Sequence, residues 1–242
     1  MPPANPSRSI NLWLYLGLPL SLIVLLLIAD PTRLDFTIAH LFYSSDSGFI
    51  GRHDTFLEAV LHDRAKQAVI LIGVLAIAGL LASVVFRGGA HLRRPLGYLV
   101  LAMGLSTAIV TPLKALTAVQ CPWDLRDFGG QETYSALLAE RPATLHPGRC
   151  WPGGHASSGF AFFSLFFLLR DRRPRLARVA LLGALILGGV FSLARMLQGA
   201  HFLSHNLWTA LFDWLICLGA YRLVLYRQAT TEPQHQALPA SP

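Results

Sequence analysis

Apolar residues in this chain are gathered into six runs that polar segments separate. Most of the runs approach the roughly 20 residues that an α-helix needs to cross a lipid bilayer. Because the apolar residues are bunched rather than spaced with the period of a surface helix or strand, the pattern predicts an all-α, polytopic membrane helical bundle with six transmembrane helices. The runs are Leu12–Ala29, Ala68–Phe86, Leu96–Leu113, His155–Leu169, Val179–Leu197 and Leu207–Leu225.

The fourth run is the shortest, and the segment Trp151-Pro152-Gly153-Gly154-His155 leads into it. We expect the fourth helix to take its first turn from this segment. Proline interrupts regular structure, and glycine lets backbone N–H groups approach a ligand closely. The start of a helix also attracts anions, because its first N–H groups are unpaired and its dipole is positive there. The segment is therefore a candidate anion site if other segments bring cations and a nucleophile to it.

The composition agrees with a membrane protein. Hydrophobic residues make up 53% of the 242 residues and charged residues only 14%, whereas a soluble domain carries about a quarter charged residues. The net charge of +7 would suggest nucleic acid in a soluble protein, but here its distribution follows the runs, and we expect no nucleic-acid partner. The first run is long enough to span and no small-residue cleavage pattern follows it, so we expect no signal peptide.

Basic residues mark one side of the membrane. The long segments on the other side, Asp30–Gln67 and Lys114–Gly154, hold ten of the 13 acidic residues. The positive-inside rule then predicts that both termini are cytoplasmic and that the long segments are outside. We expect a multi-pass protein of a bacterial inner (cytoplasmic) membrane, with its active site facing the periplasm. The basic residues are Arg8, Arg87, Arg93, Arg94, Arg170, Arg172, Arg173, Arg175, Arg178, Arg222 and Arg227.

Three further predictions concern domain organisation. Residues 1–227 are expected to form a single six-helix membrane domain. Residues 228–242 are polar and contain proline, and we expect a disordered tail there. In the first outer segment, Thr55–Lys66 is predicted to form a surface helix with apolar residues on one side.

The three cysteines divide between the membrane and one outer segment. Cys217 lies inside the last run and is interpreted as a small packing residue. Cys121 and Cys150 bracket the second outer segment, on the side of the membrane that permits disulfides. We predict that they pair and close a loop of about 30 residues, which contributes about 3–4 kcal/mol. The alternative is two free thiols.

Candidate chemistry gathers at the outer ends of the runs. Lys114 ends the third run, Gly153–His155 opens the fourth, and Arg195, His201 and His205 lie where the fifth run ends and the sixth begins. Cations and backbone N–H groups stabilise the charge on phosphoryl oxygens. One imidazole can attack phosphorus while another protonates the leaving oxygen. This set therefore indicates phosphate binding and transfer.

These residues resemble the type 2 phosphatidic acid phosphatase superfamily of integral membrane lipid phosphatases. That family shows three motifs in order: Lys-x6-Arg-Pro, Pro-Ser-Gly-His and Ser-Arg-x5-His-x3-Asp. The order and the internal spacings match here, and the resemblance covers the chain from Leu96 to Leu225, its family-like core of residues 96–225. The matching residues are Lys114 with Cys121-Pro122, then Pro152-Gly153-Gly154-His155, then Ala194-Arg195 with His201 and His205.

The resemblance implies a role for each matching residue. His201 is implied as the nucleophile that forms a phosphohistidine intermediate, and His155 as the general acid. Lys114 and Arg195, with the amides of Gly153 and Gly154, are implied as the phosphate-binding groups. Neither a metal nor another cofactor is implied, since these enzymes rely on side-chain cations.

Three positions depart from the family motifs. Cys121 stands where the family has arginine, so one phosphate-binding cation is missing. Gly153 stands where the family has serine, which removes a hydroxyl donor. His205 stands where the family has the aspartate that orients the nucleophile. A neutral imidazole there accepts a hydrogen bond from His201 but supplies no negative charge.

Neighbouring residues are candidates to compensate for these departures. Asp124 or Asp127 could take over the duty of the missing aspartate, and Arg126 or Arg149 could replace the missing cation. The departures indicate a diverged subfamily.

The resemblance implies hydrolysis of a lipid phosphate at the outer leaflet, with membrane lipids as partners. Undecaprenyl diphosphate, lipid A, phosphatidylglycerol phosphate and phosphatidic acid are the candidate substrates. Capture of the intermediate by another acceptor would make the protein a phosphotransferase. A catalytically weakened homologue that binds anionic lipid head groups is an alternative, and so is a small transporter, although neither internal repeats nor matching broken helices are present.

Two residue patterns have a second interpretation. His201 and His205, spaced i and i+4, also fit a zinc pair on one helix face, with His146 or His155 as a further ligand. Asp213 lies about two helical turns into the sixth run, too deep for a site at the outer end. We interpret it as an interhelical hydrogen-bonding residue.

Overall fold

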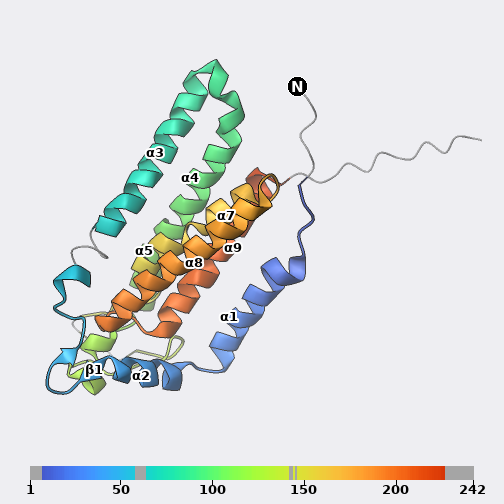
Figure 1. Cartoon of the computed structure of the whole chain (residues 1–242). Coiled ribbons are helices and arrows are strands. Elements are labelled where there is room, and N and C mark those ends of the chain that lie inside the picture. The colour runs from blue at the N-terminus through green and yellow to red at the C-terminus, as the bar shows by residue number, and fades with distance from the viewer. Residues whose placement is uncertain (1–6, 58–63, 142–143, 145, 227–242) are drawn as a thin grey trace, which may run out of the picture.

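The structure is a computed structural model, and it describes residues 7–57, 64–141, 144 and 146–226 (Figure 1). As predicted, the fold is built mainly of helices. The middle of the predicted helix at Thr55–Lys66, residues 58–63, lies outside the described residues, and the predicted tail at 228–242 lies wholly outside them. The longer helices are α1 (Leu18–Ile28, preceded by a π-helical turn at Trp13–Gly17), α2 (Thr32–Leu41), α3 (Ala65–Val85), α4 (Arg93–Ala108), α5 (Val110–Thr117), α6 (Gly154–Phe160), α7 (Phe163–Leu169), α8 (Pro174–Leu197) and α9 (Leu203–Val224).

The remaining elements are short. Two strands, β1 (Tyr43–Ser44) and β2 (Gly48–Phe49), pair antiparallel in a small hairpin that follows α2. Three 3₁₀ turns, η3 (Arg87–Leu92), η4 (Pro122–Asp124) and η5 (Arg126–Phe128), lie in the connections. Most of the described chain therefore lies in the longer helices.

Four helices in the described part of the chain are long and apolar enough to cross a membrane. The pair formed by Trp13–Ile28 and α2 makes a fifth if that pair, which bends by 87°, is one span. The fourth predicted run corresponds to Gly154–Leu169, a shorter apolar helix that does not reach the length of a span by itself. The prediction of membrane helices is therefore confirmed, and six spans stay a prediction.

Two of the six predicted runs are broken. The third run is divided into α4 and α5 at Ile109. Pro112 explains this break, because it has no N–H to donate to the carbonyl of Ala108, where α4 ends. The fourth run is divided into α6 and α7 around Ala161 and Phe162.

Helices α6 and α7 pack against α8, and α4 packs against α9 (Figure 1). α6 and α8 approach closely where Gly159 faces Gly188. A β-carbon at Gly159 would lie 2.6 Å from the Cα atom of Gly188, so the approach depends on glycine. α3 runs beside α4 at one edge of the bundle and has few contacts with the other helices. Most of α3 is consequently exposed.

Buried polar residues join α4, α6 and α9. The Ser157 hydroxyl oxygen lies 2.9 Å from the carbonyl oxygen of Ser106 and 3.3 Å from Oδ1 of Asp213. Asp213 is only 1% exposed. It makes the interhelical contact that its place in the sixth run predicted, and it fixes the helix that carries His155 against the helix that follows His201.

The segments that connect α1 to α3 and α5 to α6 meet at the lower end of the bundle in Figure 1. α2 crosses this end at a steep angle to α1, and its Phe36 packs on Phe128 and Phe202 in one aromatic cluster. The amide of Gly51, just after the hairpin, donates to the carbonyl of Leu197 at the end of α8. Both connecting segments therefore cover the turn between α8 and α9.

Candidate phosphate-binding site

One cavity of about 480 Å³ collects most of the predicted site residues. Lys114, Gly154, His155, Arg195 and His201 all line it. They come from α5, the start of α6, the last turn of α8 and the α8–α9 turn. Residues that are up to 87 positions apart in sequence thus share one wall, as the three motifs predict.

His201 lies in the turn between α8 and α9 and is 5% exposed. Its Nδ1 atom lies 2.8 Å from the carbonyl oxygen of Cys150. Because a carbonyl oxygen only accepts hydrogen bonds, Nδ1 carries the proton and donates it. The lone pair then lies on Nε2, which is the atom that a nucleophilic imidazole uses.

The surroundings of His201 favour its neutral form. Burial lowers the pKa of this imidazole well below its usual value of 6.5, and the nearby Lys114, His205 and Arg195 lower it further. The Cys150 carbonyl opposes this effect but does not outweigh it. A neutral His201 keeps its lone pair at pH 7.

We expect the folded protein to lose stability through His201 as the pH falls from 7.5 to 5.5. Below about pH 6.5 the unfolded chain binds a proton at this imidazole and the folded protein does not. Protonation then favours the unfolded state by up to about 1.4 kcal/mol per pH unit. Thermal unfolding of the wild type and of His201→Gln at both pH values checks this, and the wild type should show the larger fall. Equal falls would contradict the prediction.

Two cations lie at the same end of the cavity. A β-carbon at Gly154 would lie 3.5 Å from Nζ of Lys114, which places the ammonium group beside the start of α6. Arg195 donates from Nη1 to Oε1 of Gln198 at 2.7 Å, and its guanidinium lies over the Trp123 ring, 5.6 Å from the centroid. Gln198 and Trp123 orient Arg195, and the sequence motifs did not single out either residue.

The two glycines before His155 have different surroundings. Gly154 lines the cavity, whereas the Gly153 amide donates to the carbonyl of His205 at 3.3 Å. In this arrangement Gly153 holds the turn against α9 and does not offer its amide to the cavity, unlike its predicted role. A β-carbon at Gly153 would lie 2.5 Å from Oδ1 of Asn206. The serine of the family motif would therefore not fit here without a shift of Asn206.

The other two histidines lie on different sides of His201. His155 faces the cavity, and its ring packs on Phe191 with 4.8 Å between centroids. The His205 ring lies 5.9 Å from the His201 ring and lines a second cavity of about 180 Å³. The sequence predicted that His201 donates a hydrogen bond to His205. In the structure, His201 donates to the Cys150 carbonyl instead. Among the described residues, Nδ1 of His205 has no hydrogen-bond partner.

None of the four residues proposed to compensate for the motif departures is among the described residues that line the main cavity. Arg126 donates from Nε to the carbonyl of Gln131 at 3.1 Å. Asp127 and Arg149 are exposed, and Asp124 lies in the η4 turn. In the family motif an aspartate accepts the hydrogen bond from the nucleophilic histidine. Here the Cys150 carbonyl accepts that bond from Nδ1 of His201.

A metal site was the second interpretation of the histidine pair. Over residues 7–57, 64–141, 144 and 146–226, no three His, Cys, Asp or Glu side chains are grouped closely enough to hold a metal ion. His146, the further ligand considered, is exposed. The described residues therefore contain no set of ligands for a zinc ion.

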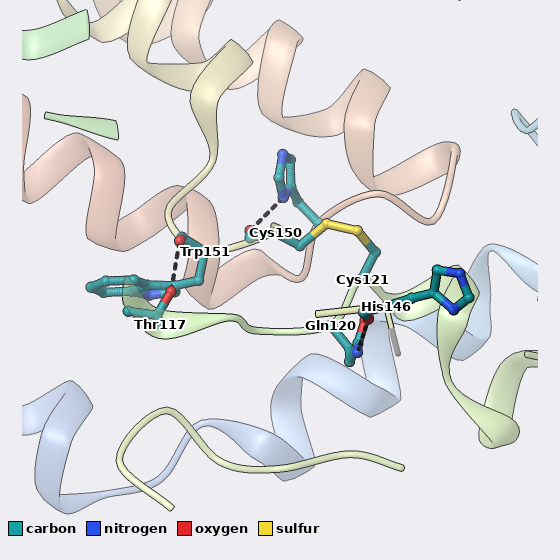
Figure 2. The surroundings of a disulfide bond; sticks show 7 residues. Thr117, Gln120, Cys121, His146, Cys150 and Trp151 are labelled. Atoms are coloured by element: carbon teal, nitrogen blue, oxygen red, sulfur yellow. Dashed lines mark hydrogen bonds between the residues drawn. A yellow bond between two sulfur atoms is a disulfide. The ribbon is translucent and has the colours of Figure 1, made fainter. Parts of the chain in front are cut away.

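Cys121 and Cys150 form the predicted disulfide, with a Cα–Cα distance of 5.1 Å (Figure 2). The position where the family has a cation thus carries a covalent link to the residue whose carbonyl holds His201. On either side of this link, Thr117 donates to the carbonyl of Trp151 at 3.1 Å and Gln120 donates to that of His146 at 2.9 Å (Figure 2). The disulfide and these bonds fix the backbone that leads into α6.

Away from the cations, the cavity is apolar. Its walls there come from Val69–Ile77 on α3 and Leu99–Thr107 on α4. Each stretch spans about 12 Å along its helix, at 1.5 Å per residue. We call this part the apolar arm. The cavity therefore joins a cationic end with two histidines to a channel of hydrocarbon character.

Comparison with known proteins gives two matches. The sequence model of the PAP2 superfamily matches residues 95–229. The lipid A 4'-phosphatase of Francisella tularensis subsp. novicida (strain U112) is 27% identical over 205 residues, which cover 81% of this chain and 88% of that protein. No solved structure matches this chain.

Proposed function

Because this chain belongs to the PAP2 superfamily, we propose that it is an integral membrane phosphatase that hydrolyses a phosphomonoester or diphosphate of a lipid. The proposal rests on one observation, the cavity that combines a cationic end with an apolar arm. Lys114 and Arg195 suit the phosphate of such a substrate, and the arm between α3 and α4 suits its hydrocarbon chain. Small-molecule sites generally combine apolar walls with a few placed polar groups in this way.

The site residues then take the following roles. Nε2 of His201 attacks phosphorus, the bond from phosphorus to the lipid oxygen breaks, and His155 donates a proton to that oxygen. Water next attacks the phosphohistidine, His155 takes its proton, and the phosphorus–nitrogen bond breaks to release phosphate and restore His201. Lys114 and Arg195 stabilise the charge on the phosphoryl oxygens in both steps. No metal ion takes part in this scheme.

Lipid A is our first candidate substrate, since the relative of 27% identity is a lipid A 4'-phosphatase. Undecaprenyl diphosphate, phosphatidylglycerol phosphate and phosphatidic acid are the others. We further propose six spans, cytoplasmic termini and a site that faces the periplasm of a bacterial inner membrane. The basic connections after the second, fourth and sixth runs support this orientation.

Phosphate release from these four lipids, by detergent-purified protein with and without a chelator, tests the proposed function. Release that survives the chelator is expected. Release that the chelator abolishes would indicate a metal enzyme, and transfer to an added alcohol would indicate a phosphotransferase. Binding of the lipids without release from any of them would contradict an enzymatic function and favour the anionic-lipid-binding alternative.

Filling the apolar arm tests its part in this function. A β-carbon at Gly104 would meet no atom within 4 Å, so Gly104→Leu should fold and narrow the arm. We expect kcat/KM for the long-chain substrate to fall about 10-fold or more, while release from a short-chain analogue of the same head group is unchanged. Gly183→Leu on α8, an exposed position where a β-carbon also meets nothing within 4 Å, is the matched control. An equal loss with both substrates would contradict a chain-binding arm.

A further inference from the structure

α9 starts two residues after His201 and lacks a cap of its own. The helix begins at Leu203, its N-cap residue is Phe202, and no side chain within it caps the first turn. The first N–H groups of a helix have no partner within the helix, and the helix dipole is positive at that end. A buried acceptor from elsewhere in the chain can therefore hold this turn in place.

Asp35 on α2 supplies that acceptor. Its Oδ1 accepts the backbone N–H of Ser204 at 2.9 Å, and its Oδ2 accepts the Ser204 hydroxyl. Asp35 is 3% exposed. Burying a carboxylate is costly unless hydrogen bonds or opposite charge compensate for it, and here two hydrogen bonds and the positive end of the helix dipole offset part of that cost.

The residue next to Asp35 strengthens the same contact. The Phe36 ring stacks on the Phe202 ring, with 5.3 Å between centroids and 21° between planes. α2 therefore holds Phe202 and Ser204, whereas His201 between α8 and this turn is held by the Cys150 carbonyl. The imidazole is positioned from two sides, and α2 provides one of them.

We propose that Asp35 is a positioning residue for the reaction at His201. This inference rests on the proposed function, and it extends the functional part of the chain to α2, which lies outside the residues 95–229 that match the family. Without the carboxylate, the first turn of α9 loses its partner, and the His201 backbone is no longer held at the position from which Nε2 reaches phosphorus. The expected loss is in the chemical step rather than in substrate binding.

The test compares Asp35→Asn with Asp30→Asn, a matched control. Asp30 is exposed, accepts hydrogen bonds from Thr32 and adopts a positive φ that asparagine tolerates. For Asp35→Asn we expect kcat on the best lipid substrate to fall about 10- to 100-fold with KM within about twofold. Ser204→Ala, which removes one of the two bonds, should give a smaller fall, and Asp35→Asn with Ser204→Ala should be no worse than Asp35→Asn alone.

A second readout does not depend on turnover. Amide hydrogen exchange in a peptide spanning residues 201–206 should be faster in Asp35→Asn and unchanged in Asp30→Asn. If the wild type releases no phosphate, the proposed function fails while this readout still tests the contact. An unchanged kcat, a rise in KM alone, or a loss equal to the loss of folded protein would overturn the positioning role, and so would unchanged exchange.

Discussion

Replacing His201 with glutamine is expected to lower phosphate release by at least about 10³-fold, because removing an enzyme's nucleophile can cost on the order of 10⁶-fold in kcat. Glutamine fills a similar volume and can still donate to the Cys150 carbonyl, which lies 2.8 Å from Nδ1 in the wild type. It has no nucleophilic nitrogen to attack phosphorus. The loss should therefore appear in kcat while lipid binding persists, because Lys114 and Arg195 remain.

Labelling with a radioactive lipid phosphate, quenched with denaturant at alkaline pH, distinguishes the covalent role. The wild type should carry an acid-labile label on histidine, and His201→Gln should carry none. His146→Gln, a change at an exposed position outside the cavity, is the control and should behave as the wild type. Label that persists in His201→Gln would assign the nucleophile to another residue and contradict our scheme.

Removal of the disulfide is expected to have the largest effect on stability. The link between Cys121 and Cys150 spans 29 residues, and closing such a loop contributes about 3–4 kcal/mol. The double substitution Cys121→Ser with Cys150→Ser should lower the free energy of unfolding by about that amount. It should also lower kcat at least about 10-fold at a temperature where the protein is folded, because the carbonyl that orients His201 belongs to Cys150.

Chemical denaturation and initial rates of the double variant measure both effects. Cys217→Ala is the control, because Cys217 is a free, buried cysteine of α9 without a part in the site. Its rate should match that of the wild type. A double variant with unchanged kcat would show that the backbone around Cys150 is held without the disulfide, and would limit the role of the link to stability.

The helices of the membrane domain could be predicted from the sequence because each apolar run fulfils a length requirement that the bilayer imposes. The breaks were harder to predict. Pro112 lies only one residue inside the end of the third run, where a proline is also compatible with continued helix in a membrane protein. α2 was missed because Thr32–Leu41 mixes charged and apolar residues within a segment that was interpreted as a connection.

The gathering of the motif residues around one cavity could be predicted, because the motif spacings reflect which ends of the helices meet. What positions them could not. The group that orients His201 is the backbone carbonyl of Cys150, and a motif comparison reads only side chains. Trp123 and Asp35 act through contacts across the fold, 72 and 169 positions from their partners Arg195 and Ser204, and no local pattern marks such pairs.

The exposed position of α3 determines which substrate concentration governs the rate of this protein, the concentration in the membrane or that in water. α3 forms one wall of the apolar arm and is covered by hydrocarbon when the protein is in a bilayer or a micelle. A lipid that reaches the arm past this helix comes from the same two-dimensional phase and never from bulk water. The rate of a lipid phosphatase built in this way follows the mole fraction of substrate in the membrane. Inert phospholipid or detergent then acts as a diluent at the surface, even when the molar amount of substrate is constant.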